Sequence, residues 1–219
     1  MSHFRFRHPP ILMAPIFLAC SCFGQSWSLG GAAGFGFYHD AGITNGTSSS
    51  AKAGFGPRVA ASAVLGQDLG DRFGGELRYT FRDGDSELKS GGQQVNMDAE
   101  AHAVHYDFLL YGTPRHNKLR PYVAAGGGIK RYMATGVEYP AQPLSNFAFL
   151  THANEVEGML SAGGGLKYAI SEHWLVRVDF RYYLTPFPDK LFVPAAGAKI
   201  NGWLHDFVPL AGVDWTFGR

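Results

Sequence analysis

The segment from Trp174 to Thr185 repeats with a period of two, with one continuous apolar face and charged residues on the other. Positions 174, 176, 178, 180, 182 and 184 hold large apolar or aromatic residues, and Arg177, Asp179 and Arg181 lie between them. Successive side chains of a β-strand point to opposite faces, so the pattern predicts a strand with one apolar face and one charged face. Its length of about a dozen residues suits a tilted strand that crosses a bilayer.

Seven further segments show related alternation, and polar or glycine-rich connections separate them. We expect strands at roughly 28–38, 52–66, 73–82, 99–111, 119–135, 157–170 and 205–217, besides 174–185. The connections alternate between long and short. Membrane barrels carry short periplasmic turns at one rim and longer loops at the other. The pattern therefore predicts an all-β protein, an eight-stranded, up-and-down antiparallel transmembrane β-barrel, whose loops 39–51, 83–98, 136–156 and 186–204 face outward.

The polar faces of these strands carry charges of both signs. Eight strands enclose only enough space for side chains to fill, and a buried charge without a partner is unfavourable. We therefore expect a salt-bridged interior that keeps the barrel shut; the alternative is a narrow, gated conduit for small or hydrophobic solutes, in which ion pairs exchange partners. Lys167 is expected diagonal to Asp179, within reach of an ion pair. The expected barrel-lumen charges are Glu76, Arg78, Arg82, Asp107, Lys130, Lys167, Arg177, Asp179, Arg181 and Asp214.

Aromatic residues gather near the ends of the expected strands. Amphipathic rings at two membrane interfaces produce two such girdles, although aromatic residues are also common in strands generally. The expected aromatic girdle comprises Phe73, Trp174, Trp215 and Phe217 at the periplasmic rim, and Phe37, Phe81, Tyr182 and Phe207 toward the outer rim.

Prolines and glycine runs modify the strand pattern. Pro57 and Pro209 fall inside expected strands and each lacks an N–H donor, so we expect a bulge or a bend at each. The glycine runs 126–128 and 163–165 are expected on neighbouring strands. There they let the wall curve tightly or leave room for lumen side chains opposite.

The first 24 residues have the features of a secretory signal peptide. Arg5 and Arg7 precede a short apolar core at 11–23, which is too short to span a membrane. We expect cleavage near Gly24–Gln25, which leaves residues 25–219 as the barrel domain; the alternative is lipidation at Cys20. Because the chain's two cysteines both lie in this segment, the mature chain is expected to have no disulfide.

Composition narrows the class of protein further. Charged residues make up 17% of the 219 residues, below the roughly 25% of average soluble domains. No run of about 18 apolar residues occurs, which argues against membrane-spanning helices. The net charge is +1 and no basic stripe is present, so we expect no nucleic-acid partner.

Catalytic and metal-binding patterns find little support in the chain. The histidines are scattered, with no HExxH and no recognisable metal-ligand spacing. His105 and Asp107 share a strand face and resemble an acid–base pair, but lumen-filling polar residues explain them more simply. We expect no catalytic residue, no metal and no cofactor. The rival interpretations are a lipid-modifying enzyme and a soluble lipocalin-like barrel.

The chain from about Ser28 to Phe217 resembles the small eight-stranded outer-membrane barrels of the OmpA/OmpX type. The stretches RPYVAAGGGIK, SAGGGLKY, WLVRVDFRYY and VDWTF carry the resemblance. It implies a location in the outer membrane, contact with outer-membrane lipid and recognition by the barrel assembly machinery. Members usually end at an aromatic residue, whereas Gly218 and Arg219 follow Phe217 here. We expect a non-enzymatic structural or surface-interaction role, with the external loops open to a surface partner.

Overall fold

The computed structural model describes residues 26–45 and 50–218. The expected signal peptide at 1–24, its cleavage site and the lipidation alternative at Cys20 lie outside the described residues, as do residues 46–49 of the first expected loop. Across the described residues, no helix is long and apolar enough to cross a membrane.

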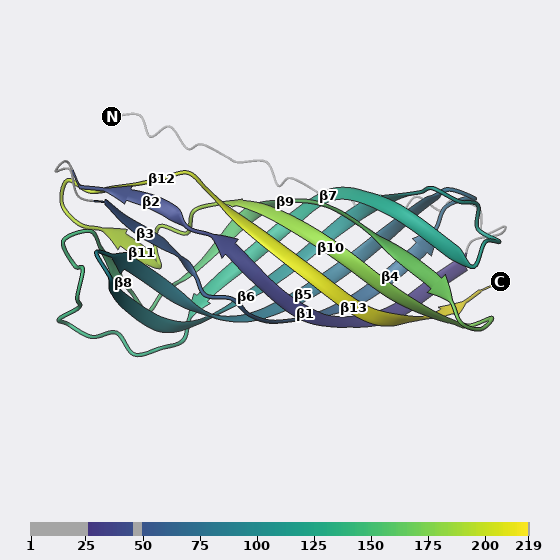
Figure 1. The fold of residues 1–219 in the computed structure, drawn as a ribbon, viewed down its shortest axis with the longest axis horizontal. Helices are drawn as coiled ribbons and strands as arrows, with labels where there is room; N and C mark the ends of the chain where they lie inside the picture. Colours follow the sequence, from purple (N-terminus) through teal and green to yellow (C-terminus); the bar gives the residue numbers. More distant parts are fainter. Residues whose placement is uncertain (1–25, 46–49, 219) are drawn as a thin grey trace, which may run out of the picture.

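Eight long strands form a closed antiparallel ring, which confirms the predicted barrel (Figure 1). The order around the ring is β5-β4-β1-β13-β10-β9-β7-β6, and β6 pairs again with β5. The glycine runs 126–128 and 163–165 lie on the paired strands β7 and β9, as expected. The ring strands are β1 (Ser26–His39), β4 (Arg58–Asp68), β5 (Phe73–Ser90), β6 (Gln93–Tyr111), β7 (Leu119–Ala134), β9 (Asn154–Ala169), β10 (Trp174–Pro186) and β13 (Trp203–Phe217).

The ring presents apolar side chains outside and polar side chains inside. On β10, Val178 is 61% exposed, whereas the next residue, Asp179, is 2% exposed. Phe180 is exposed and Arg181 is buried, so the alternation continues along the strand. A soluble lipocalin-like barrel would have the opposite arrangement, so that rival is wrong. An apolar exterior is what a barrel needs in contact with hydrocarbon.

A smaller unit, which we call the outer extension, continues the wall at the end of the barrel opposite the short turns (Figure 1). It comprises the outer ends of β5 and β6, the connections 135–153 and 187–202, and five short strands. Of these, β12 pairs with β2, β2 with β3, and β3 with β5, while β8 and β11 form a separate ribbon. The short strands are β2 (Ala41–Thr44), β3 (Ser50–Phe55), β8 (Ala148–Leu150), β11 (Phe192–Pro194) and β12 (Lys199–Asn201).

The expected loop at 83–98 is wrong, because this stretch is a β-hairpin. Strand β5 runs to Ser90 and β6 begins at Gln93. Gly91 and Gly92 have φ of +57° and +80°, and two positive-φ residues in a two-residue connection match the hairpin turn that fits strand twist. Outside the membrane the exposed face is polar, and Leu88 points to a buried core. The segment therefore lacks the apolar outer face by which the other strands were recognised.

The two prolines behave differently. Phe55 lies opposite Ser86, and Ala60, five residues later, lies opposite Arg82, only four residues earlier. One extra residue therefore sits in the stretch around Pro57, which confirms the expected bulge. At Pro209 no residue is inserted, because the register against β10 is unbroken through the Phe180–Pro209 pair, so the bulge alternative is wrong. The pairing with β1 is nevertheless interrupted there, between Gly34–Leu210 and Phe37–Phe207.

Candidate functional site

The interior of the barrel contains all ten of the charged residues that the alternation pattern placed there. Each has at most 4% of its surface exposed. They come from six of the ring strands and point inward because each occupies the inward-facing position of its strand. The ten are Glu76, Arg78, Arg82, Asp107, Lys130, Lys167, Arg177, Asp179, Arg181 and Asp214.

Glu76 lies at the centre of the larger group of ion pairs. Its carboxylate accepts hydrogen bonds from Arg78 at 2.6 Å, from Arg177 at 2.9 Å and from Arg181 at 3.0 Å. Asp179 provides a second centre, 2.8 Å from Arg177 Nε and 3.3 Å from Arg78 Nη2. These contacts join β5 to β10, which are not neighbours in the ring, so the pairs cross the interior.

Asp107 and Asp214 complete this group. Asp107 lies 3.1 Å from Arg181 Nη1, and Asp214 lies 3.3 Å from Arg177 Nη1 and 3.4 Å from Lys167 Nζ. Four carboxylates thus face four cations among the described residues. A buried ion that loses its partner costs several kcal/mol, so balanced pairing is what allows this interior to be filled with charge.

The expected diagonal placement of Lys167 and Asp179 is confirmed, but the ion contacts of Lys167 are with Glu76 and Asp214 instead. In the register of β9 and β10, Lys167 lies opposite Arg177 and Asp179 lies opposite Gly165. Lys167 and Asp179 are therefore diagonal neighbours. Asp179 is instead engaged by the guanidinium groups of Arg78 and Arg177, and a planar multi-donor group meets a carboxylate better than an ammonium does.

A second, smaller group lies nearer the outer extension. The Asp206 carboxylate contacts Arg82 and accepts a 2.6 Å hydrogen bond from Lys130. The Tyr38 ring lies under the Arg82 guanidinium, 4.3 Å from Cζ. Asp206 was missing from the expected lumen charges, although it lies on the same strand face as Asp214. The alternation of residues 205–217 was the signal that could have identified it.

Glycines leave the space that the interior side chains occupy. A Cβ atom on Gly165 would lie 2.7 Å from Asp179 Cβ, and one on Gly163 would lie 3.0 Å from Arg181 Cδ. The run at 163–165 therefore lets β9 approach the charged side chains of β10.

The eight expected girdle residues all face out from the ring and are exposed or half-buried. Trp174 and Trp215 are cross-strand partners near the short-turn end. At the other end the Tyr182 hydroxyl and His205 Nδ1 share a hydrogen bond of 2.7 Å, and the Tyr182 ring packs against Phe207. Trp203 faces out from the same region and was not among the expected residues.

His105 and Asp107 lie close together but inside the filled interior. The His105 Nε2 to Asp107 Oδ2 distance is 3.4 Å, and both side chains are fully buried. Asp107 also forms an ion pair with Arg181, so a substrate has no access to the His105–Asp107 pair. Among residues 26–45 and 50–218, no group of three or more His, Cys, Asp or Glu could hold a metal ion.

The outer extension is built around an apolar core. Ile43 on β2, Leu88 on β5 and Leu150 on β8 are buried together. The Phe55 ring stacks on Tyr132 with centroids 5.2 Å apart and meets Phe192 edge-on at 5.5 Å. All four connections that were expected to be loops therefore pack into one folded unit at the mouth of the barrel.

Outside this core, the extension carries an acidic side chain with a shifted titration. Asp189 lies in the turn before Leu191, and its pKa is raised, first by partial burial and then by the nearby negative charge of Glu155. Lys190, the next residue, lies 3.2 Å from Glu155.

Comparison with known proteins agrees with this architecture. The model of a family described as "Outer membrane protein beta-barrel domain" matches residues 16–203. Neisserial surface protein A (NspA) has a similar structure, with a TM-score of 0.51, 14% identity, and coverage of 89% of this chain and 99% of that one. OprG from Pseudomonas aeruginosa gives a TM-score of 0.57, 14% identity and coverage of 87% and 95%. At this identity the two structures support the fold alone. No curated protein sequence matches the chain.

Proposed function

Because the chain belongs to the outer membrane protein beta-barrel domain family and lies in the cell outer membrane, we propose that it is a non-enzymatic surface-interaction protein. In this proposal the barrel is the membrane anchor and the outer extension presents a binding surface outside the cell. The short turns then face the periplasm, as they do in barrels of this kind.

The filled interior supports the anchoring role of the barrel. The side chains of Glu76, Arg78 and Arg177 have no exposed surface, and their pairs cross from one wall to the other. A solute could pass only if several of these buried pairs separated together, which would leave unpaired charges at a cost of several kcal/mol each. This favours a closed anchor over a conduit.

The outer extension is the observation that carries the proposal. A connection that only returned the chain to the membrane would need a few residues, whereas here the hairpin of β5 and β6, the ribbon of β8 and β11, and strands β2, β3 and β12 pack around one apolar core. Ordered structure of this kind beyond the membrane holds side chains at fixed positions, as a specific binding surface requires.

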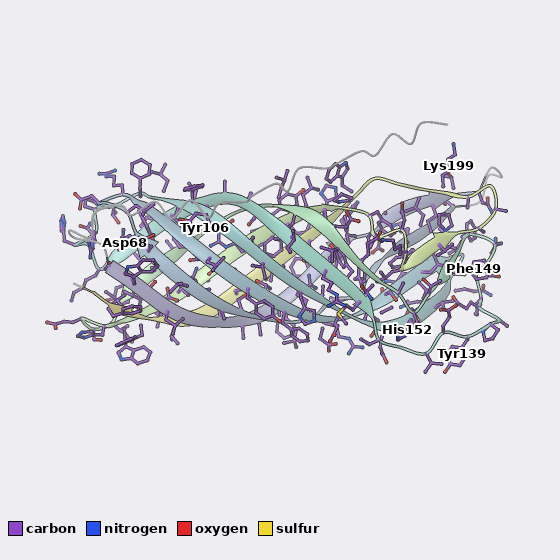
Figure 2. All side chains as sticks on the ribbon, turned by 180° about the vertical axis from the view of Figure 1, so that it is seen from behind. Asp68, Tyr106, Tyr139, Phe149, His152 and Lys199 are labelled. Carbon is purple, nitrogen blue, oxygen red and sulfur yellow. The ribbon has the colours of Figure 1, made fainter. Side chains whose placement is uncertain are left out.

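Exposed apolar side chains on the extension are the natural contacts for a partner. Tyr139 is 66% exposed in the connection after β7, and Phe149 is exposed on β8, opposite Val193 on β11. Figure 2 shows Tyr139, Phe149 and Lys199 at one end of the molecule and Asp68 at the other. Aromatic side chains are enriched among residues that dominate protein interfaces.

A binding experiment with the full chain in lipid nanodiscs tests this proposal. Arrays of extracellular-matrix proteins and of glycans are probed with the wild type, with the double variant Tyr139→Ser, Phe149→Ser, and with Leu69→Ser. Leu69 is an exposed apolar residue in the short turn after β4. Its replacement by serine is therefore the control: it is a similar change at the periplasmic end. We expect binding by the wild type and by the Leu69 variant, and its loss in the double variant. Absence of wild-type binding, or equal binding by all three proteins, would contradict the proposal.

The lipid-modifying alternative is separated by a direct assay. The purified protein is incubated with phospholipid and lipopolysaccharide, and the lipids are examined by mass spectrometry. We expect unchanged lipid masses; a new acylated or deacylated product that depends on folded protein would overturn the non-enzymatic assignment.

A further inference from the structure

A cavity of about 700 Å³ opens at the short-turn end of the barrel. The three short connections 69–72, 112–118 and 170–173 surround it, and the inward faces of β7, β9 and β13 form its walls. A volume of this size is typical of sites for small molecules. Asp68 marks this end of the molecule in Figure 2.

Three cations lie side by side beneath this cavity. In the strand register, Arg120 on β7 lies opposite Lys167 on β9, and Lys167 lies opposite Arg177 on β10. All three therefore share one row of the inner wall. Like charges directly opposite each other destabilise a sheet. Arg177 is balanced by Glu76 and Asp214. The positive charges of Lys167 and Arg120 are less completely neutralised by nearby carboxylates.

Lys167, the middle cation, has unused hydrogen-bonding capacity. Its Nζ lies 3.4 Å from Asp214 Oδ2 and 3.8 Å from Glu76 Oε2, and it makes no hydrogen bond with any described residue. An ammonium group has three donors. The Lys167 side chain is 5% exposed and contributes to the lining of the cavity.

Arg120 adds further donors at the same level. Its Nη1 is 3.0 Å from Asp68, and its guanidinium lies over the Tyr111 ring, 3.7 Å from the centroid. Its Nε is buried without a hydrogen-bond partner among the described residues. A buried donor that lacks an acceptor is unfavourable by about 1–3 kcal/mol, so a shift of the Arg120 side chain toward an anion in the cavity would also relieve this cost.

The rim of the cavity carries charges of both signs. Arg115 and Lys118 come from the connection between β6 and β7, and Asp71 and Glu172 come from the other two turns. Asp68, the acid nearest the base, is engaged by Arg120 and also accepts a hydrogen bond from Ser26. The acidic groups at the base are therefore occupied, and the unused polar groups there are donors.

We propose that this inner cavity binds a small anionic solute through a carboxylate or phosphate group, held at the base by Lys167 and Arg120. The site lies at the opposite end from the outer extension, so it does not depend on the proposed surface role. Charge-assisted hydrogen bonds from two cations in a partly dry cavity are strong enough to hold such a group. The apolar side chain of Leu175, which also lines the cavity, would face the rest of the solute.

The test uses the full chain in lipid nanodiscs, with inorganic phosphate and succinate as separate probes at constant ionic strength and with chloride as the reference salt. Amide chemical shifts are followed by NMR. We expect saturable shifts confined to the turns at 68–72, 115–120 and 167–172. A response to phosphate alone, to succinate alone or to both identifies the anionic group and supports the proposal. Shifts that are no larger than those in chloride would overturn it.

Three variants decide whether the response comes from this cavity. Lys167→Gln should weaken binding about tenfold or more, and Lys118→Gln, at the exposed rim, should weaken it by a smaller factor. Lys52→Gln makes the same change in the outer extension and should leave binding unchanged. Equal weakening by Lys118→Gln and Lys52→Gln would show charge screening only and would overturn the proposal, even if Lys167→Gln fails to fold.

Discussion

Glu76 on β5 and Arg177 on β10 lie 101 residues apart in the sequence, and Glu76 Oε2 and Arg177 Nη2 are 2.9 Å apart across the barrel interior. Three other strands separate β5 from β10 on one side of the ring. The pair therefore ties opposite walls together, and the fold can close only when distant parts of the chain have assembled.

Glu76→Gln should destabilise the protein strongly. It removes the negative charge that Arg78, Arg177 and Arg181 share, and loss of one partner from a buried ion pair costs about 3–5 kcal/mol. Urea unfolding of the protein in lipid vesicles measures the change. The matched control is Glu172→Gln in the short turn after β9, which should stay within about 0.5 kcal/mol of the wild type. Similar stabilities for the two variants would refute the structural importance of the network.

Gly165→Ala should disturb the contact between β9 and β10. The added Cβ would lie 2.5 Å from the Val178 carbonyl oxygen and 2.7 Å from Asp179 Cβ, and overpacking of this kind costs about 1–3 kcal/mol. Gly158 lies on the same strand with no atom within 4 Å of an added Cβ. Gly158→Ala should therefore be neutral or slightly stabilising. The prediction fails if unfolding midpoints rank the two variants in the opposite order.

Asp189→Asn should stabilise the outer extension at neutral pH. The pKa of Asp189 is raised in the folded protein by partial burial and by Glu155, so the charged form is disfavoured there relative to the unfolded chain. The destabilising contribution is present above the folded pKa and disappears as the pH falls below the unfolded value of about 3.8. Hydrogen exchange of the extension should show a gain for the variant at pH 7 that is absent at pH 3. A gain at pH 3 as large as at pH 7 would contradict this sign.

Trp215 should lie at the headgroup level of the membrane. It pairs with Trp174 near the short-turn end of the ring, where an amphipathic ring is stable. In a variant with Trp27, Trp174 and Trp203 replaced by Phe, lipids brominated near the headgroup should quench Trp215 fluorescence more than lipids brominated near the chain ends. The reverse order would place this residue in the hydrocarbon core and would refute the girdle at this rim.

The ring could be predicted from the sequence because the membrane imposes one rule on every strand. Apolar side chains must face lipid, so β10 repeats Val178 outside and Asp179 inside, and the inward charges follow from counting by two. Beyond the membrane this rule ends. Leu88 on the outer part of β5 points inward, away from solvent, which reverses the pattern and hides the hairpin from the same analysis.

The alternation pattern could not predict which interior carboxylate pairs with which cation. Register places Lys167 diagonal to Asp179, but Arg78, from a non-neighbouring strand, takes a place beside that carboxylate. Contacts across the interior depend on strand tilt and on side-chain length. Counting register partners along two neighbouring strands takes neither into account. Asp206 shows the opposite case, since counting by two from Asp214 leads to it directly.

Current recording from the purified wild-type protein in a planar lipid bilayer tests the closed interior most directly. With Glu76, Asp179 and their cationic partners filling the lumen, we predict a baseline without discrete openings across the applied voltage range. Reproducible single-channel steps from folded protein, absent from protein-free bilayers, would contradict the account and would favour a conduit.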